Sequence, residues 1–215
     1  MPPSATAGEI ASNAMLGKKE RLVAAARDLL YRQGVEHTTL ADIAETAEVP
    51  LGNVYYYFKT KDDLVAAVVQ THVGQLRAGV AALELRHRSP KARLKALVGM
   101  GAEQGDTIAR YGCPFGTLSS ELTKRAGDET DPLAAELMHT LVAWAEEQFR
   151  ALGRRDARDL AVELVVTYQG SAVVSSALGE PQLFARQTRR LQKWIDALQA
   201  PGPERPGSKP KGTQP

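Results

Sequence analysis

The stretch from Thr38 to Lys61 constrains the fold more than any other part of this chain. Thr39 and Asp42 have the spacing of a capping box, which predicts that a helix begins there. Small and apolar residues then recur every three or four positions, as on one face of a helix: Leu40, Ile43, Ala44 and Ala47. Pro50 suits only the first turn of a helix, so a second helix is expected to begin near it.

The second of these helices carries a run of aromatic side chains. Val54 and Phe58 are four residues apart and can both face a core. The three tyrosines between them cannot all point inward, because successive helix residues are about 100° apart: Tyr55, Tyr56 and Tyr57. A short polar and aromatic helix braced by a small apolar one is typical of a helix-turn-helix that reads the DNA major groove. The alternative is a buried helix pair with an aromatic face.

Seven residues of this unit are candidate DNA contacts: Thr39, Asn53, Tyr55, Tyr56, Tyr57, Lys59 and Lys61. The asparagine amide matches the edge of adenine, and tyrosines can contact thymine methyl groups or phosphates. The two lysines lie where the next helix begins, and Lys61 in particular is placed to bind a phosphate together with backbone amides. Alternative roles are a helix cap for Thr39, a solvent-facing amide for Asn53 and partial burial for Tyr57.

The same stretch resembles the N-terminal domain of TetR/AcrR-type transcriptional regulators over residues 18 to 65. The motifs that carry this resemblance are Thr38-Thr39, Asp42-Ile43-Ala44, Ala47-Glu48-Val49, Tyr55-Tyr56-Tyr57-Phe58, Lys59-Thr60-Lys61 and Asp62-Asp63-Leu64. Many family members have a serine and a basic residue where this chain has Pro50 and Leu51. A hydroxyl cap and one possible phosphate contact are therefore missing here, which bears on the operator sequence more than on DNA binding itself.

The resemblance implies a ligand-responsive transcriptional regulator, most often a repressor that a small-molecule effector releases from double-stranded operator DNA. It also implies an effector pocket among the central helices. Candidate lining residues, chosen as aromatic or imidazole side chains of the kind that line binding pockets, are His72, Phe115, His139, Trp144 and Tyr168. Each of these residues could instead belong to the ordinary core or surface.

Hydrophobic periodicity predicts an all-α chain of about nine helices. Residues 17–62 form the expected helix-turn-helix DNA-binding domain, and residues 63–200 the expected helical effector-binding and dimerisation domain. A long fourth helix should run to about Arg88, and a fifth from Pro90 to the break at Gly112. Residues 1–16 and 201–215 are rich in small residues, Pro and Gly, and are expected to be disordered tails.

The helix expected at about 157–178 is apolar on two sides, so it needs packing partners on two sides. Paired with the last helix, at about 181–199, it could form a four-helix bundle with a second copy of the chain. A homodimer through the last two helices would also supply the second half-site of an operator. The alternative is that these helices cover the core of a monomer.

Composition excludes several classes of protein. The chain has 215 residues, 43% of them hydrophobic, and a net charge of only +2, so it is not a polycation that binds DNA by charge alone. No run of about 20 apolar residues indicates a membrane span, and no basic-then-apolar signal pattern opens the chain. A cytoplasmic protein is expected. The histidines lack metal-ligand spacing, so no metal or cofactor is expected: His37, His72, His87 and His139.

Two rival functions and one cysteine are left open by the sequence. An enzyme is disfavoured, because no Gly-x-Ser-x-Gly, phosphate-binding Gly-rich loop or His-Glu-x-x-His motif occurs. A helical protein-interaction module is the third class, and it would bind its partner without the steep salt dependence of DNA binding. The single cysteine, Cys113, precedes a helix and is either a reactive thiol or a small buried apolar residue.

Overall fold

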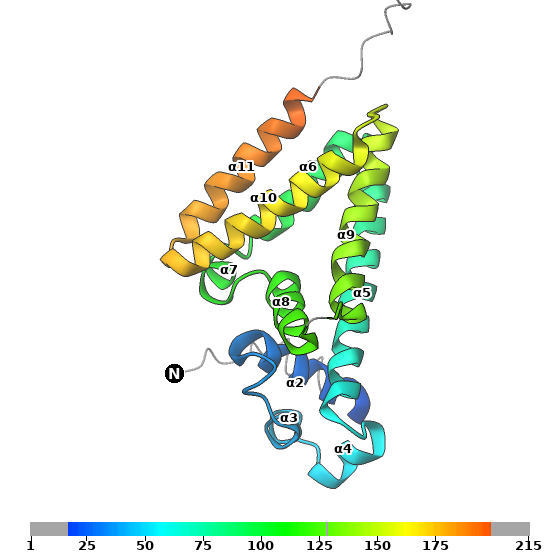
Figure 1. Cartoon of the computed structure of the whole chain (residues 1–215), viewed down its shortest axis with the longest axis vertical. Coiled ribbons are helices and arrows are strands. Elements are labelled where there is room, and N and C mark those ends of the chain that lie inside the picture. Colours follow the sequence, from blue (N-terminus) through cyan, green and yellow to red (C-terminus); the bar gives the residue numbers. More distant parts are fainter. Residues whose placement is uncertain (1–16, 128, 199–215) are drawn as a thin grey trace, which may run out of the picture.

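The computed structural model describes residues 17–127 and 129–198, which are helical apart from the connecting turns. The predicted tails at 1–16 and 201–215 lie outside the described residues. Figure 1 shows the N-terminal helices at one end, long helices running along the molecule and a layer of helices at the other end. The elements are α2 (Lys18–Gln33), α3 (Leu40–Thr46), α4 (Leu51–Tyr57), α5 (Lys61–Arg86), α6 (Pro90–Ala102), α7 (Gly105–Tyr111), α8 (Pro114–Ala126), α9 (Pro132–Ala151), α10 (Ala157–Leu178) and α11 (Pro181–Ala197).

The segment after Pro90 differs from the single helix expected there. It is two helices, because α6 ends at Ala102 and Gln104 has non-helical backbone angles before α7 begins. Glycines at 99, 101 and 105 weaken a continuous helix, since glycine is a poor helix former. Gly101 is also needed for packing, because a side chain there would overlap the hydroxyl of Tyr168 on α10.

Two large clusters of buried apolar residues hold the molecule together, and a small third one joins α7, α10 and α11. One large cluster joins α2, α3 and α4 to the first half of α5 and the facing ends of α8 and α9. The other joins the second half of α5 to α6, α9, α10 and α11. The long helix α5 contributes to both, so it is a continuous rod between the two ends of the molecule (Figure 1).

Helix α8 makes a second connection between the two ends, through polar contacts. The carboxylate of Glu121 accepts a hydrogen bond from the backbone N–H of Val35 at 2.5 Å. Arg125 pairs with Asp62 at the start of α5 at 2.6 Å and with Glu36 after α2 at 3.2 Å. A displacement of α8 would therefore act directly on the loop between α2 and α3 and on the start of α5.

One helix of the described residues, α10, is long and apolar enough to cross a membrane by length and composition. Core helices of soluble proteins have the same properties, so this is weak evidence for a membrane span. Helix α10 packs against α7, α9 and α11 in this structure.

Candidate DNA interface and effector cavity

The first helix of the helix-turn-helix begins with the predicted capping box. The Thr39 hydroxyl accepts from the Asp42 N–H at 3.2 Å, and the Asp42 carboxylate accepts from the Thr39 N–H at 2.8 Å. The Asp42 carboxylate also accepts from the Thr39 hydroxyl at 2.7 Å, and this bond together with that from the Thr39 N–H holds the pKa of Asp42 below its usual value. The turn then passes through Glu48 at φ 53°, and Val49 donates to the Ala44 carbonyl at 2.9 Å. Capping and turn together fix the direction in which α4 leaves.

Helix α4 has one buried face and one exposed aromatic face. Val54 is fully buried and Phe58, just after the helix, is nearly so, which confirms the predicted inward pair. Tyr56 is 77% exposed and Tyr55 is 50% exposed, so neither ring is needed to close the core. Pro50 precedes the helix without any side-chain cap, as the absence of a serine there implies. The exposed face is therefore free to contact another molecule.

The other candidate contacts are less exposed or already have partners. Asn53 and Tyr57 are partly buried, and the Tyr57 ring packs against the core. The Lys59 ammonium donates to the Tyr55 carbonyl at 2.9 Å, so it caps the end of α4. Lys61 is the first residue of α5 and is partly buried.

Two residues that sequence analysis did not propose also lie on this surface. Leu51, the first residue of α4, is 43% exposed although it is apolar. Gly52 has open space around its Cα, so another molecule could approach the backbone closely. The position of Leu51 just before the tyrosines could have indicated that it lies on the same surface. A single leucine in a short helix is normally assigned to the core, however.

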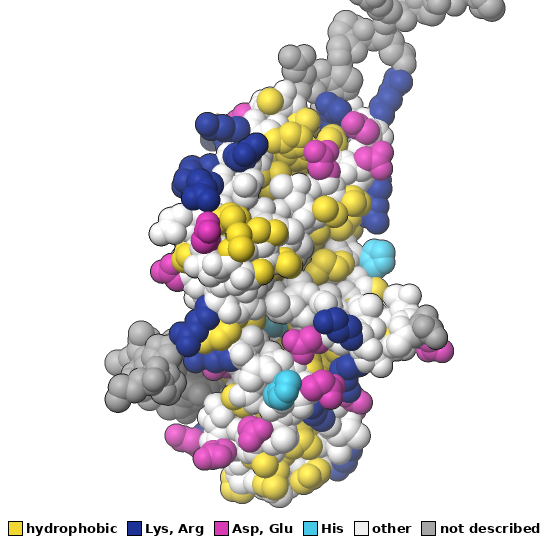
Figure 2. All heavy atoms as spheres, turned by 60° about the vertical axis from the view of Figure 1, so that its left-hand side comes forward, with side chains coloured by type: hydrophobic (Ala, Val, Ile, Leu, Met, Phe, Trp, Pro, Cys, Tyr) yellow, Lys and Arg dark blue, Asp and Glu magenta, His cyan; other side chains and the backbone are white. Residues whose placement is uncertain are grey.

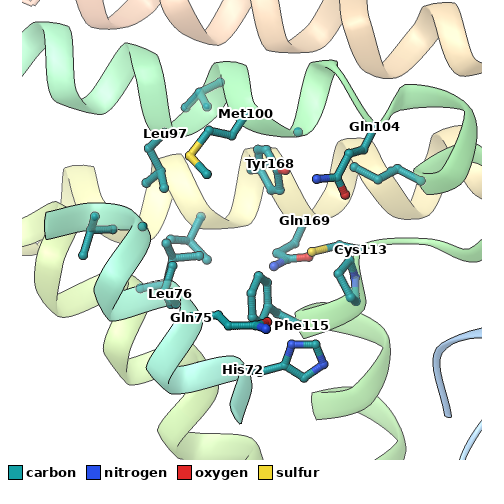
Figure 3. A pocket seen from close by; sticks show the side chains of 18 of the residues that line it. His72, Gln75, Leu76, Leu97, Met100, Gln104, Cys113, Phe115, Tyr168 and Gln169 are labelled. Carbon is teal, nitrogen blue, oxygen red and sulfur yellow. The ribbon is translucent and has the colours of Figure 1, made fainter. Parts of the chain in front are cut away.

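A cavity of about 660 Å³ is lined by residues of every helix from α5 to α10 and of α2 (Figure 3). His72, Phe115 and Tyr168 line it, so three of the five proposed pocket residues meet there. The other two lie outside it. Trp144 is buried and donates from its indole N–H to the Glu84 carboxylate at 2.8 Å, whereas His139 is exposed on α9.

The wall of the cavity is largely apolar, and its imidazole and phenol groups are neutral near pH 7. Burial and the charge of Arg27 lower the pKa of His72 to about 4. Burial raises the pKa of Tyr31 to about 12 and also raises that of Tyr168. The Tyr31 hydroxyl donates to the Gly112 carbonyl at 2.7 Å, which joins α2 to the entry of α8 beside the cavity.

Cys113 lies in the same wall, at the residue that precedes α8. Its side chain is buried, and burial raises the pKa of the thiol, so the protonated form is favoured. This favours the small apolar residue over the reactive thiol. Within 17–127 and 129–198, no group of three or more His, Cys, Asp or Glu side chains could hold a metal ion.

Polar residues of the cavity were missed by sequence analysis, notably Gln75, Gln104 and Gln169. An isolated glutamine on an otherwise mixed helix gives no sequence pattern. Only the packing of separate helices brings these side chains to one space.

Comparison with known proteins agrees with this geometry. The profile of bacterial regulatory proteins of the tetR family matches residues 22–68, which include α3 and α4. Residues 22–68 thus carry the DNA-binding domain of a TetR-type transcriptional regulator. The DNA-binding unit is the helix-turn-helix described above.

Relatives of this chain are transcriptional regulators from several bacteria. An uncharacterized HTH-type regulator of Lactococcus lactis is 32% identical over 120 residues, which cover 54% of this chain and 60% of that protein. An uncharacterized HTH-type regulator of Mycobacterium tuberculosis is 28% identical over 191 residues, 82% of this chain and 95% of the relative. The chain thus spans less than two thirds of the Lactococcus protein and nearly all of the mycobacterial one.

Solved structures show the same fold at low sequence identity. A TetR transcriptional regulator from Legionella pneumophila has a TM-score of 0.73 and 17% identity, with 84% of this chain and 98% of that chain covered. The reduced form of NemR from Escherichia coli has a TM-score of 0.70 and 16% identity, with 82% and 96% covered. Likeness at this identity concerns the fold alone.

Proposed function

We propose that this TetR-type regulator is a homodimeric repressor that binds operator DNA through α4 and is released when a small uncharged molecule fills the cavity. The observation that carries the DNA contact is Tyr56, which is 77% exposed on a helix whose opposite face is buried. Residues 17–62 act as the DNA-binding domain and residues 63–200 as the effector and dimerisation domain. A cytoplasmic location accords with this role.

The support for a dimer is an unpartnered apolar face on α10. Val162, Val166, Val173 and Val174, which we call the α10 stripe, are each 39 to 65% exposed on the side opposite the core. Figure 2 shows hydrophobic side chains gathered on this half of the molecule, with Lys and Arg side chains beside them. Four β-branched side chains on one face would be stabilised by burial against a second copy. We infer that α10 and α11 of two copies form a four-helix bundle.

The proposed release mechanism depends on geometry. Two recognition helices must enter successive major grooves, about 34–36 Å apart. A ligand in the cavity would contact α5, which continues into the DNA-binding end, and α8, which holds that end through Glu121 and Arg125. The ligand can shift the equilibrium between the DNA-binding and the released conformation only if its affinities for the two conformations differ.

Replacement of Tyr56 by alanine tests the recognition helix. The Tyr56→Ala protein should keep its helicity and oligomeric state, because the side chain is mostly exposed. Its operator affinity should fall about tenfold or more, since one good base or phosphate contact contributes about 1–3 kcal/mol. Footprint titration measures this effect, with Leu85→Ala, an exposed position on α5, as the control. Equal affinity for wild type and Tyr56→Ala would remove this residue from the interface.

Replacement of Lys61 by alanine tests a phosphate contact. The Lys61→Ala protein should bind all DNA sequences more weakly, and the slope of log K against log salt should fall in magnitude by about one unit. Lys124→Ala, an exposed lysine on α8, should leave the slope unchanged. A loss of affinity confined to one base pair would instead mean base readout by Lys61. Binding that shows no salt dependence at all would favour the protein-interaction module.

A further inference from the structure

The Gln169 side chain is an unusual member of the cavity wall. Its amide nitrogen is buried and has no hydrogen-bond partner among the described residues. Figure 3 shows the amide reaching from α10 into the region bounded by Cys113 and Phe115. The Cys113 thiol lies within weak hydrogen-bonding reach of the Gln169 side chain, but sulfur does not replace an oxygen acceptor. A buried donor without a partner costs about 1–3 kcal/mol, so this arrangement destabilises the unliganded protein.

Gly116 makes room for this amide. A Cβ atom at Gly116 would overlap the Gln169 amide oxygen, so any other residue at this first turn of α8 would displace the glutamine. The amide therefore lies against the first turn of α8. An unpaired donor in a largely apolar cavity is suited to select a ligand by one polar group.

The charges around the cavity argue for a ligand without net charge. The two charged side chains in the wall, Arg27 and Asp28, are adjacent on α2 and have opposite signs. Asp28 is also paired with Arg32 at 2.9 Å. The imidazole, phenol and thiol groups of the wall are neutral, so a cation would lose its hydration without a partner, and an anion would find only Arg27.

We propose that the cavity takes an uncharged, largely apolar molecule with an acceptor oxygen, such as a ketone, and that the Gln169 amide donates a hydrogen bond to this oxygen. The inference rests on the proposed function, because it concerns the ligand class of the same effector cavity. Gln169 is thus a specificity-determining residue. The free-energy cost of its unpaired donor in the unliganded protein is offset when the donor binds the acceptor oxygen of the ligand.

The test uses prodan, a neutral naphthalene dye whose ketone shifts its emission when it accepts a hydrogen bond. Titration of the full chain should show binding with a hydrogen-bonded ketone. Gln169→Met keeps the length of the side chain and removes the donor, so the affinity should fall about 3- to 10-fold and the emission should move to shorter wavelength. Gln70→Met, an exposed glutamine on α5 that does not line the cavity, is the matched control and should behave as wild type.

Two further measurements separate this role from mere packing. Gln169→Met should unfold at the same temperature as wild type or higher, because an unpaired buried donor is gone. Neutral phenylnaphthylamine should bind at least about tenfold more tightly than anilinonaphthalene sulfonate, which differs from it by one anionic group.

Failure of the ligand class and failure of the effector role give different results. Unchanged prodan affinity and emission in Gln169→Met, tighter binding of the sulfonate dye, or no binding of either neutral dye would overturn the inference. Binding through Gln169 that leaves operator affinity unchanged would instead support the ligand class and contradict the proposed release mechanism.

Discussion

The Val173→Glu protein is expected to be a folded monomer whose operator affinity is at least about 100-fold below that of the wild type. Val173 is 65% exposed in the single chain and lies in the middle of the α10 stripe, so a carboxylate there is hydrated in the monomer. In the proposed dimer the same carboxylate would be buried without a partner, at a cost of several kcal/mol. A monomer has only one recognition helix. It therefore loses the gain in operator affinity, about 10²- to 10⁴-fold, that a dimer has because its second recognition helix binds at a high effective concentration.

Analytical ultracentrifugation and circular dichroism read assembly and folding separately. Leu85→Glu is the control, because Leu85 is 90% exposed on α5 and lies outside the α10 stripe. A Val173→Glu protein that stays dimeric and folded would exclude this face as the interface. An unfolded chain would mean that Val173 belongs to the core, as the alternative of a monomer requires.

The pH dependence of stability should change markedly when His72 is replaced. The pKa of His72 is about 4 in the folded chain, against 6.5 as its ordinary value, because burial and Arg27 disfavour the imidazolium. The unfolded state therefore binds more protons between pH 4 and 6.5, and the free energy of unfolding rises with pH over that range. His72 should account for about 2–3 kcal/mol of this rise, with no further contribution above pH 6.5.

Urea unfolding at pH 4.5, 5.5 and 7 measures this contribution as a difference between proteins. His72→Gln stays uncharged, so its stability should vary less with pH than that of the wild type. His139→Gln changes an exposed histidine on the same molecule and should follow the wild-type curve. Parallel curves for wild type and His72→Gln would mean that the buried imidazole becomes protonated without cost, contrary to its burial.

The DNA-binding end was accessible to sequence analysis because its signals are local. A capping box, a proline at the start of a helix and the inward pair Val54 and Phe58 each depend on residues within four positions of one another. The outward position of Tyr56 follows from the same spacing. The break between α6 and α7 was missed because the local pattern allowed one helix, whereas the close approach of Tyr168 to Gly101 joins distant parts of the chain.

The amino-acid sequence by itself determined the helical class, the helix-turn-helix and the two apolar sides of α10, because helix periodicity and capping act over a few residues. Only the tertiary structure decided which side chains share the cavity. His72 and Tyr168 meet there, whereas Trp144 turns toward Glu84, and His139 faces solvent. The unpaired amide of Gln169 is likewise a property of packing, since the absence of a partner depends on every helix around it.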